Sequence, residues 1–126
     1  ACRRQRQMCI RDSSLSLAKR DISGAMQSYA DLTEFLIRYP ESEYIDAARE
    51  RLIFLRNLIA SSELDGAEYY MKRGAYLAAL NRANYVLKNI PNSTETQRAL
   101  DIMKKSFIEL GYEEYAEKVS SVEALN

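Results

Sequence analysis

Apolar residues recur at intervals of three and four over most of this 126-residue chain. These intervals place side chains on one face of a helix, so they predict a series of amphipathic helices. The chain has only four glycines and two prolines, fewer turn-forming residues than an all-β fold needs. The first expected helix begins at Asp21, which can cap the free amides of the first turn, and ends at Tyr39 before Pro40. Its apolar positions are Ile22, Ala25, Met26, Tyr29, Leu32, Leu36 and Tyr39.

Four further helices are expected after Pro40. Ser42 caps a long helix over about 43–73, and Ser61 with Ser62 leaves a kink within it open. Gly74 supplies the left-handed end of this helix, and small residues near Gly66 suit the close approach of another helix. The third expected helix covers 76–90 and ends at Pro91. The fourth begins with a capping box of Thr94 and Gln97 and ends at Gly111. The last helix runs to Asn126 and is expected to bury Tyr112, Ala116, Val119 and Val122.

An internal repeat indicates how these helices are arranged. The segment FLIRYPES at 35–42 returns as VLKNIPNS at 86–93, so that the helix-ending proline and the following serine coincide at a shift of 51 residues. A tetratricopeptide unit has about 34 residues, and an unusually long middle helix accounts for the difference. A single helix hairpin cannot cover its own apolar face, so neighbouring hairpins must stack. We therefore expect an all-α fold, a tetratricopeptide-like superhelix of helix hairpins (an α-α solenoid).

Composition excludes several classes of function. Lys plus Arg and Asp plus Glu number 18 each, so no net field attracts nucleic acid. The sequence has no histidine and no glycine-rich phosphate loop, and its two cysteines, Cys2 and Cys9, lack further ligands for a zinc site. We therefore expect no catalytic residues, no metal and no cofactor. The chain is predicted to be a protein-binding module and not an enzyme.

Residues 1–18 differ from the rest of the chain. The opening ACRRQRQMCIRDS is basic and has no sustained apolar period, so we expect a disordered leader outside the helical domain of residues 19–126. The alternative is a basic arm that contacts anionic lipid or RNA.

Nine tyrosines and no tryptophan are present. Tyrosine suits interfaces because it combines a rigid ring with a polar end, but most of these residues lie on the predicted apolar stripes. We expect core packing for Tyr29, Tyr39, Tyr70, Tyr76 and Tyr112. Tyr69 and Tyr85 fall off the stripes and are the expected surface contacts.

Two stretches carry a resemblance to a known family. KRDISGAMQSYADLTEFLIRYPESEY at 19–44 and AEYYMKRGAYLAALNRANYVL at 67–87 resemble the C-terminal half of the BamD (ComL) proteins, which are outer-membrane lipoproteins of Gram-negative bacteria. The resemblance runs from Lys19 to Asn126. It implies a scaffold subunit of the β-barrel assembly machinery on the periplasmic face of the outer membrane. Neither Cys2 nor Cys9 follows the small and apolar residues that precede a lipidated cysteine, so the family's membrane anchor is missing from this chain.

The resemblance also implies partners and docking residues. In the family this half engages the BamA barrel subunit through the POTRA domain nearest the barrel, and by position the docking arginines are Arg73 and Arg82. A guanidinium presents a fixed fork of donors to a carboxylate, which suits that role. Tyr69 and Tyr85 are added as surface contacts, and a BamC-like lipoprotein is a second possible partner. Two alternatives stay open: the arginines serve helix ends or neighbouring apolar surface, or the chain is a general peptide-binding adaptor of the cell envelope.

Overall fold

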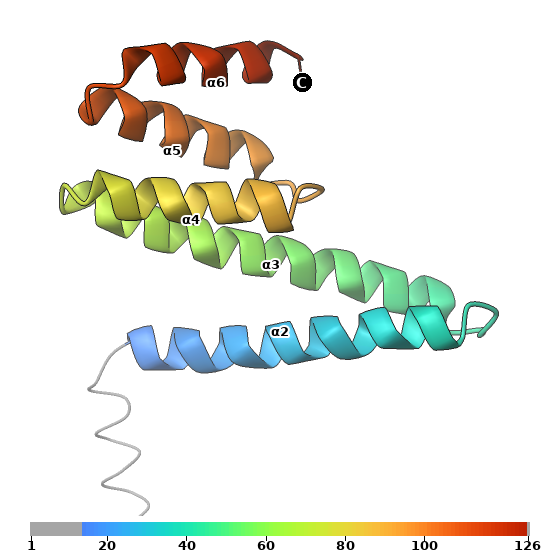
Figure 1. The fold of residues 1–126 in the computed structure, drawn as a ribbon. Helices are drawn as coiled ribbons and strands as arrows, with labels where there is room; N and C mark the ends of the chain where they lie inside the picture. The colour runs from blue at the N-terminus through green and yellow to red at the C-terminus, as the bar shows by residue number, and fades with distance from the viewer. Residues whose placement is uncertain (1–13, 126) are drawn as a thin grey trace, which may run out of the picture. The chain divides into compact units, whose positions relative to one another are not determined.

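The computed structural model describes residues 14–125, with side chains from residue 22 onward. Within these residues the chain forms five helices and no strand (Figure 1), which confirms the all-α, helical-repeat prediction. Contacts divide the chain into two units, residues 1–55 and 56–126, and each is described by itself. The helices are α2 (Ser14–Arg38), α3 (Ile45–Lys72), α4 (Tyr76–Asn89), α5 (Thr96–Glu109) and α6 (Glu113–Leu125).

The first unit contains α2, the following turn and the beginning of α3. Helix α2 ends just before Pro40, as predicted. The Tyr39 amide donates to Phe35 O at 2.9 Å, and the chain leaves the helix at Pro40. The beginning of α2 differs from the prediction, because the helix starts at Ser14 and Asp21 therefore lies inside it. The cap assigned to Asp21 is wrong, and Ser14 lies within the expected leader 1–18. The expected disorder and the basic arm at residues 1–13 lie outside the described residues, as do both cysteines.

The repeat is visible in the geometry of two turns. Ser42 Oγ accepts a hydrogen bond from the Tyr44 amide at 3.2 Å, and Ser93 Oγ accepts one from the Glu95 amide at 3.4 Å. The amides of the same two serines donate to the carbonyls of Tyr39 and Ile90. These two contacts of the first turn thus have counterparts 51 residues later.

Helix α3 runs without interruption from Ile45 to Lys72, as predicted, and ends where the sequence indicates. Gly74 has a φ of 77°, a left-handed conformation that glycine adopts without strain. The Gly74 amide donates to Met71 O at 3.0 Å and the Ala75 amide to Tyr70 O at 2.9 Å, which satisfies the last carbonyls of the helix. Gly111, with a φ of 86°, ends α5 in the same manner. These two turns define the hairpins α3–α4 and α5–α6.

Small side chains form the centre of the second unit. Alanines of α3 and α4 are fully buried against one another, so the two helix backbones approach closely in the region where the sequence carries small residues. Leu87 and Met103 pack against this cluster. Its buried members are Ala60, Leu64, Ala67, Ala79, Ala83, Val86, Ala99 and Ile102.

The beginning of α5 does not use the predicted capping box. Helix α5 starts at Thr96, and Gln97 Nε2 donates to Glu123 of α6 at 3.2 Å instead of reaching back to Thr94. The Thr94 amide donates to Asn57 Oδ1 of α3 at 3.1 Å. A side chain 37 residues earlier in the sequence thus holds this turn, and local spacing could not indicate it.

Several apolar residues expected to be buried are exposed. Tyr39 and Tyr112 lie in turns and not in helices, so the helical stripe that assigned them to the core does not apply to them. Met26 and Val122 are also exposed, whereas Ala116 and Val119 of α6 are buried as expected. The stripe predictions therefore fail at Tyr39 and Tyr112, outside the helices, and also at Met26 in the middle of α2 and Val122 in α6.

Candidate functional site

All four residues expected to dock a partner lie on the hairpin formed by α3 and α4, within the second unit. Tyr69 is in the last turn of α3, Arg73 immediately follows that helix, and Arg82 and Tyr85 lie in the middle of α4. The Gly74 turn reverses the chain between them, so residues from two helices come together on one hairpin.

Two arginines and two tyrosines form a continuous series of contacts on this hairpin. The guanidinium carbon of Arg73 lies 4.6 Å from the centre of the Tyr69 ring, and that of Arg82 lies 5.5 Å from the centre of the Tyr70 ring. The two rings meet edge to face, with their centres 5.8 Å apart. Contacts of a cation with an aromatic face contribute about 0.5–1 kcal/mol at exposed sites. We call Tyr69, Tyr70, Arg73 and Arg82 the arginine–tyrosine cluster.

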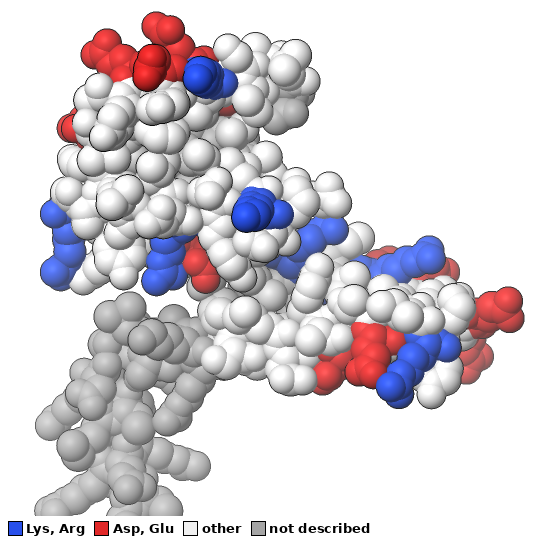
Figure 2. Space-filling view, in the orientation of Figure 1, with Lys and Arg blue, Asp and Glu red and all other residues white. Residues whose placement is uncertain are grey.

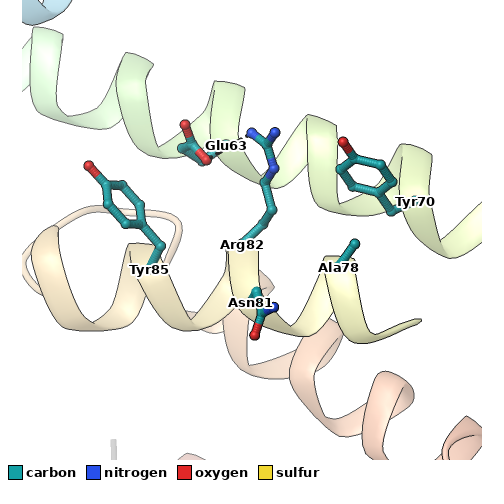
Figure 3. Close-up of a pocket in the computed structure, with 6 residues that line it drawn as sticks. All are labelled: Glu63, Tyr70, Ala78, Asn81, Arg82 and Tyr85. Atoms are coloured by element: carbon teal, nitrogen blue, oxygen red, sulfur yellow. Dashed lines mark hydrogen bonds and ion pairs between the residues drawn. The ribbon is translucent and has the colours of Figure 1, made fainter. Parts of the chain in front are cut away.

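An ion pair joins Arg82 to α3. Arg82 Nη1 donates to Glu63 Oε2 at 3.1 Å, and the two side chains are 42% and 24% exposed. Figure 3 shows Arg82 extending from α4 toward α3, between Glu63 and Tyr70. Gly66 of α3 adds no side chain there, and a Cβ at this position would lie 3.5 Å from Arg82 Nη1. The Arg82 guanidinium is therefore held by Glu63 and Tyr70 of α3, beside Gly66.

An open, shallow pocket lies between these side chains (Figure 3), lined by Glu63, Tyr70, Ala78, Asn81, Arg82 and Tyr85. It contains one cation, one anion, an amide and two phenol groups, so it offers hydrogen-bond donors and acceptors to a molecule outside. Such side chains suit recognition of a polar surface. Their arrangement provides no nucleophile paired with a base.

The structure brings all four predicted docking residues onto the hairpin formed by α3 and α4. Tyr69 and Tyr85 are 44% and 42% exposed, which agrees with their expected surface position. Arg73 is exposed as well. The intramolecular role considered for the arginines is also present, because Arg82 covers Tyr70 and pairs with Glu63. Tyr70 was expected in the core, and it does pack against the buried cluster while one face contacts Arg82.

Arg98, another arginine of the second unit, contacts three carboxylates, whereas Arg82 contacts one. Arg98 of α5 contacts Asp65 at 2.6 Å and Glu68 at 2.9 Å, both on α3, and Glu95 at 3.4 Å. The hydrogen bond from Arg98 lowers the pKa of Glu68, against a smaller opposing effect of burial. The hydrogen bonds that Arg98 donates to Glu68 and Asp65 in turn raise the pKa of Arg98 above its ordinary value. This group, which we call the Arg98 network, joins α3 to α5.

No local pattern in the sequence indicated that Glu63 would pair with Arg82, or that Asp65 and Glu68 would pair with Arg98. Glu63 lies 19 residues from Arg82, and Glu68 and Asp65 lie 30 and 33 residues from Arg98, so no helical spacing relates these pairs. Glu95, three residues before Arg98, is the one local partner in the network. A charged residue in the solvent-facing pattern of α3 has many possible partners, and only the packing of α4 and α5 on α3 selects one.

Charge is unevenly distributed over the second unit. Acidic side chains gather over α6 in Figure 2, and this helix contains Glu113, Glu114, Glu117 and Glu123 with Lys118 as its one basic residue. Helix α4 contains no acidic residue, and Arg82 and Lys88 are its charged residues. Between residues 14 and 125, no helix combines the length and apolarity that a membrane crossing requires. In the same range no group of three or more possible ligands is placed to hold a metal ion.

Comparisons with known proteins agree with the resemblance seen in the sequence. The model of the family YfiO, described as "Outer membrane lipoprotein", matches residues 4–122, a range that begins inside the expected leader 1–18. Outer membrane protein assembly factor BamD of Xylella fastidiosa is 35% identical over 109 residues, which cover 86% of this chain and 37% of the relative. The protein of the same name from Vibrio cholerae is 31% identical over 107 residues, covering 85% and 44%.

The match to Neisseria meningitidis BamD is similar, with 32% identity over 99 residues that cover 79% of this chain and 37% of the relative. The chain thus spans well under half the length of these relatives. The family model covers nearly all of its sequence, residues 4–122, and the relatives match 79–86% of it. The chain therefore belongs to the BamD (YfiO) family of outer membrane lipoproteins.

Proposed function

We propose that this chain is a non-enzymatic scaffold of outer-membrane β-barrel protein assembly and insertion, and that it docks a protein partner through the arginine–tyrosine cluster. Its place is the periplasmic face of the outer membrane in a Gram-negative bacterium. The expected partner is a BamA-like barrel subunit, bound through a POTRA domain, with a BamC-like lipoprotein as a second candidate. The relatives are named outer membrane protein assembly factors, which supports the process.

The exposed arginine–tyrosine cluster is the observation that carries the docking assignment. Arginine and tyrosine, together with tryptophan, are enriched among the residues that dominate binding energy at protein interfaces. Here two of each stand on one hairpin, ordered by stacking, before any partner arrives. Side chains already held in position lose less conformational entropy on binding, which favours affinity.

The ion pair between Arg82 and Glu63 determines how the assignment must be tested. Replacing Arg82 alone by glutamate would put two carboxylates side by side and so disturb the hairpin as well as the docking surface. The charge-swap variant Glu63→Arg with Arg82→Glu keeps an opposite pair at this site. It therefore separates folding of the hairpin from recognition of a partner.

We expect the charge-swap variant to retain the helical circular dichroism and melting temperature of the native chain, and to bind the POTRA domains of the barrel subunit about tenfold more weakly or worse. Affinity is measured by calorimetry with those domains purified from the same bacterium. The matched control is the same charge swap at an exposed ion pair of the first unit, Glu34→Arg with Arg38→Glu, which also leaves the net charge of the chain unchanged. Native affinity of the charge-swap variant would refute docking through Arg82.

A further inference from the structure

The pocket beside Arg82 carries both signs of charge. Among its six lining residues Arg82 is the only cation and Glu63 the only anion. The other four, Tyr70, Ala78, Asn81 and Tyr85, are uncharged at neutral pH. A partner that approaches Arg82 therefore meets Glu63 at the same time.

The ion pair leaves both groups able to bind further atoms. It joins Nη1 of Arg82 to Oε2 of Glu63 at 3.1 Å, a single contact and not a fork. A guanidinium has five N–H donors and a carboxylate has two acceptor oxygens. Both side chains remain accessible, with exposures of 42% and 24%, so the unused atoms can be reached from outside.

Glu63 alone supplies negative charge to this pocket. Asp65 and Glu68, the next acidic residues of α3, are bound by Arg98 on the side of α5. Helix α4 has no acidic residue. Replacing Glu63 by an uncharged residue would thus leave Arg82 as the only charged residue that lines the pocket.

We propose that Glu63 is a specificity-determining residue of the docking site, which selects a partner surface carrying a carboxylate and a cation side by side. The partner's carboxylate binds the free N–H groups of Arg82, and its cation binds the free oxygen of Glu63. This inference rests on the proposed function, because it concerns the same pocket.

Electrostatics favours this partner over an isolated acidic residue. A lone carboxylate attracted to Arg82 is repelled by Glu63 a few ångströms away, and like charges brought together at an interface oppose binding. A neighbouring cation on the partner turns this repulsion into attraction. A built-in charge that penalises the wrong partner is a common source of specificity.

The test uses Glu63→Gln, which keeps the shape of the side chain and removes its charge. We expect about fivefold weaker binding of the POTRA domains of the barrel subunit, with binding restored by Glu63→Asp. Glu68→Gln is the matched control, because it removes a glutamate of the same helix that contacts Arg98 and does not line the pocket. We expect it to leave the affinity unchanged.

The partner's cation is identified by replacing the lysines and arginines of its docking face with alanine, one at a time. One of these alanine changes in the partner is expected to weaken its binding to the native chain about fivefold. The same change should not further weaken binding to the Glu63→Gln variant, as expected when the two replaced residues contact each other. The inference is overturned if Glu63→Gln binds the POTRA domains as tightly as the native chain or more tightly. It is also overturned if the loss of affinity in Glu63→Gln is independent of every lysine and arginine replaced on the partner. If the charge-swap variant still fails to bind in those cases, the proposed docking through Arg82 stands while this inference falls.

Discussion

The hairpin α3–α4 and the contact between α3 and α5 each centre on one arginine, and the two arginines are used differently. Arg98 meets two carboxylates of α3 and that of Glu95, the residue just before α5, and its side chain is 29% exposed. Arg82 meets one carboxylate through one nitrogen and stacks on an aromatic ring. The comparison indicates that the first arginine holds the fold together, while the second keeps hydrogen-bonding capacity for a partner.

Replacing Arg98 should have the largest effect on stability. Arg98→Met removes three charged contacts and leaves Asp65, Glu68 and Glu95 near one another, so we expect a loss of about 2 kcal/mol in the free energy of unfolding. Urea unfolding followed by circular dichroism measures it. Arg82→Met is the comparison and should lose less than about 1 kcal/mol, as a half-exposed ion pair does. Equal losses for the two variants would remove the distinction drawn between these arginines.

The pH dependence of stability sharpens the same distinction. The pKa of Glu68 is lowered in the folded chain by its hydrogen bond with Arg98, so the ionised form stabilises the fold above the ordinary glutamate pKa of about 4.3. This contribution is lost as pH falls through the lowered pKa. The difference in unfolding free energy between the native chain and Glu68→Gln should therefore be constant near neutral pH and shrink below about pH 4.3. A difference that does not change down to pH 3 would contradict the role given to Arg98.

The smallest expected effect concerns the aromatic support of Arg82. Tyr70→Leu keeps apolar bulk against the buried cluster and removes the ring beneath the guanidinium, so we expect a loss of stability of about 0.5 kcal/mol. Partner binding should weaken about two- to threefold, because Arg82 loses one of the contacts that position it. Calorimetry and urea unfolding measure the two effects on the same sample. A loss of stability with unchanged binding would show that stacking on Tyr70 does not prepare Arg82 for docking.

The helices could largely be predicted from the sequence because their signals are local. Pro40 and Pro91 end helices through their missing amide, and Gly74 and Gly111 adopt the positive φ that a helix end requires. Prediction failed where no local signal exists. The apolar period of the sequence did not indicate a helix start at Ser14, and the turn before α5 is held by Asn57 from a distant part of α3.

The candidate site could be predicted in part for the same reason. The exposure of Tyr69 and Tyr85 follows from their position off the apolar stripe, and helical spacing is enough to infer it. The pairing of Arg82 with Glu63 depends on how α4 packs on α3, which brings together residues 19 positions apart. Small alanines at that crossing allow the close approach, but their spacing does not state which charged residues will meet.

All six residues that line the pocket fall between Glu63 and Tyr85. A recognition surface encoded in so short a stretch of one gene can be altered by few mutations and can diverge between species together with its partner. It can also be transplanted. A designed protein that carries this hairpin with a further helix over its apolar face, as α5 provides here, would present the same chemistry outside its native chain.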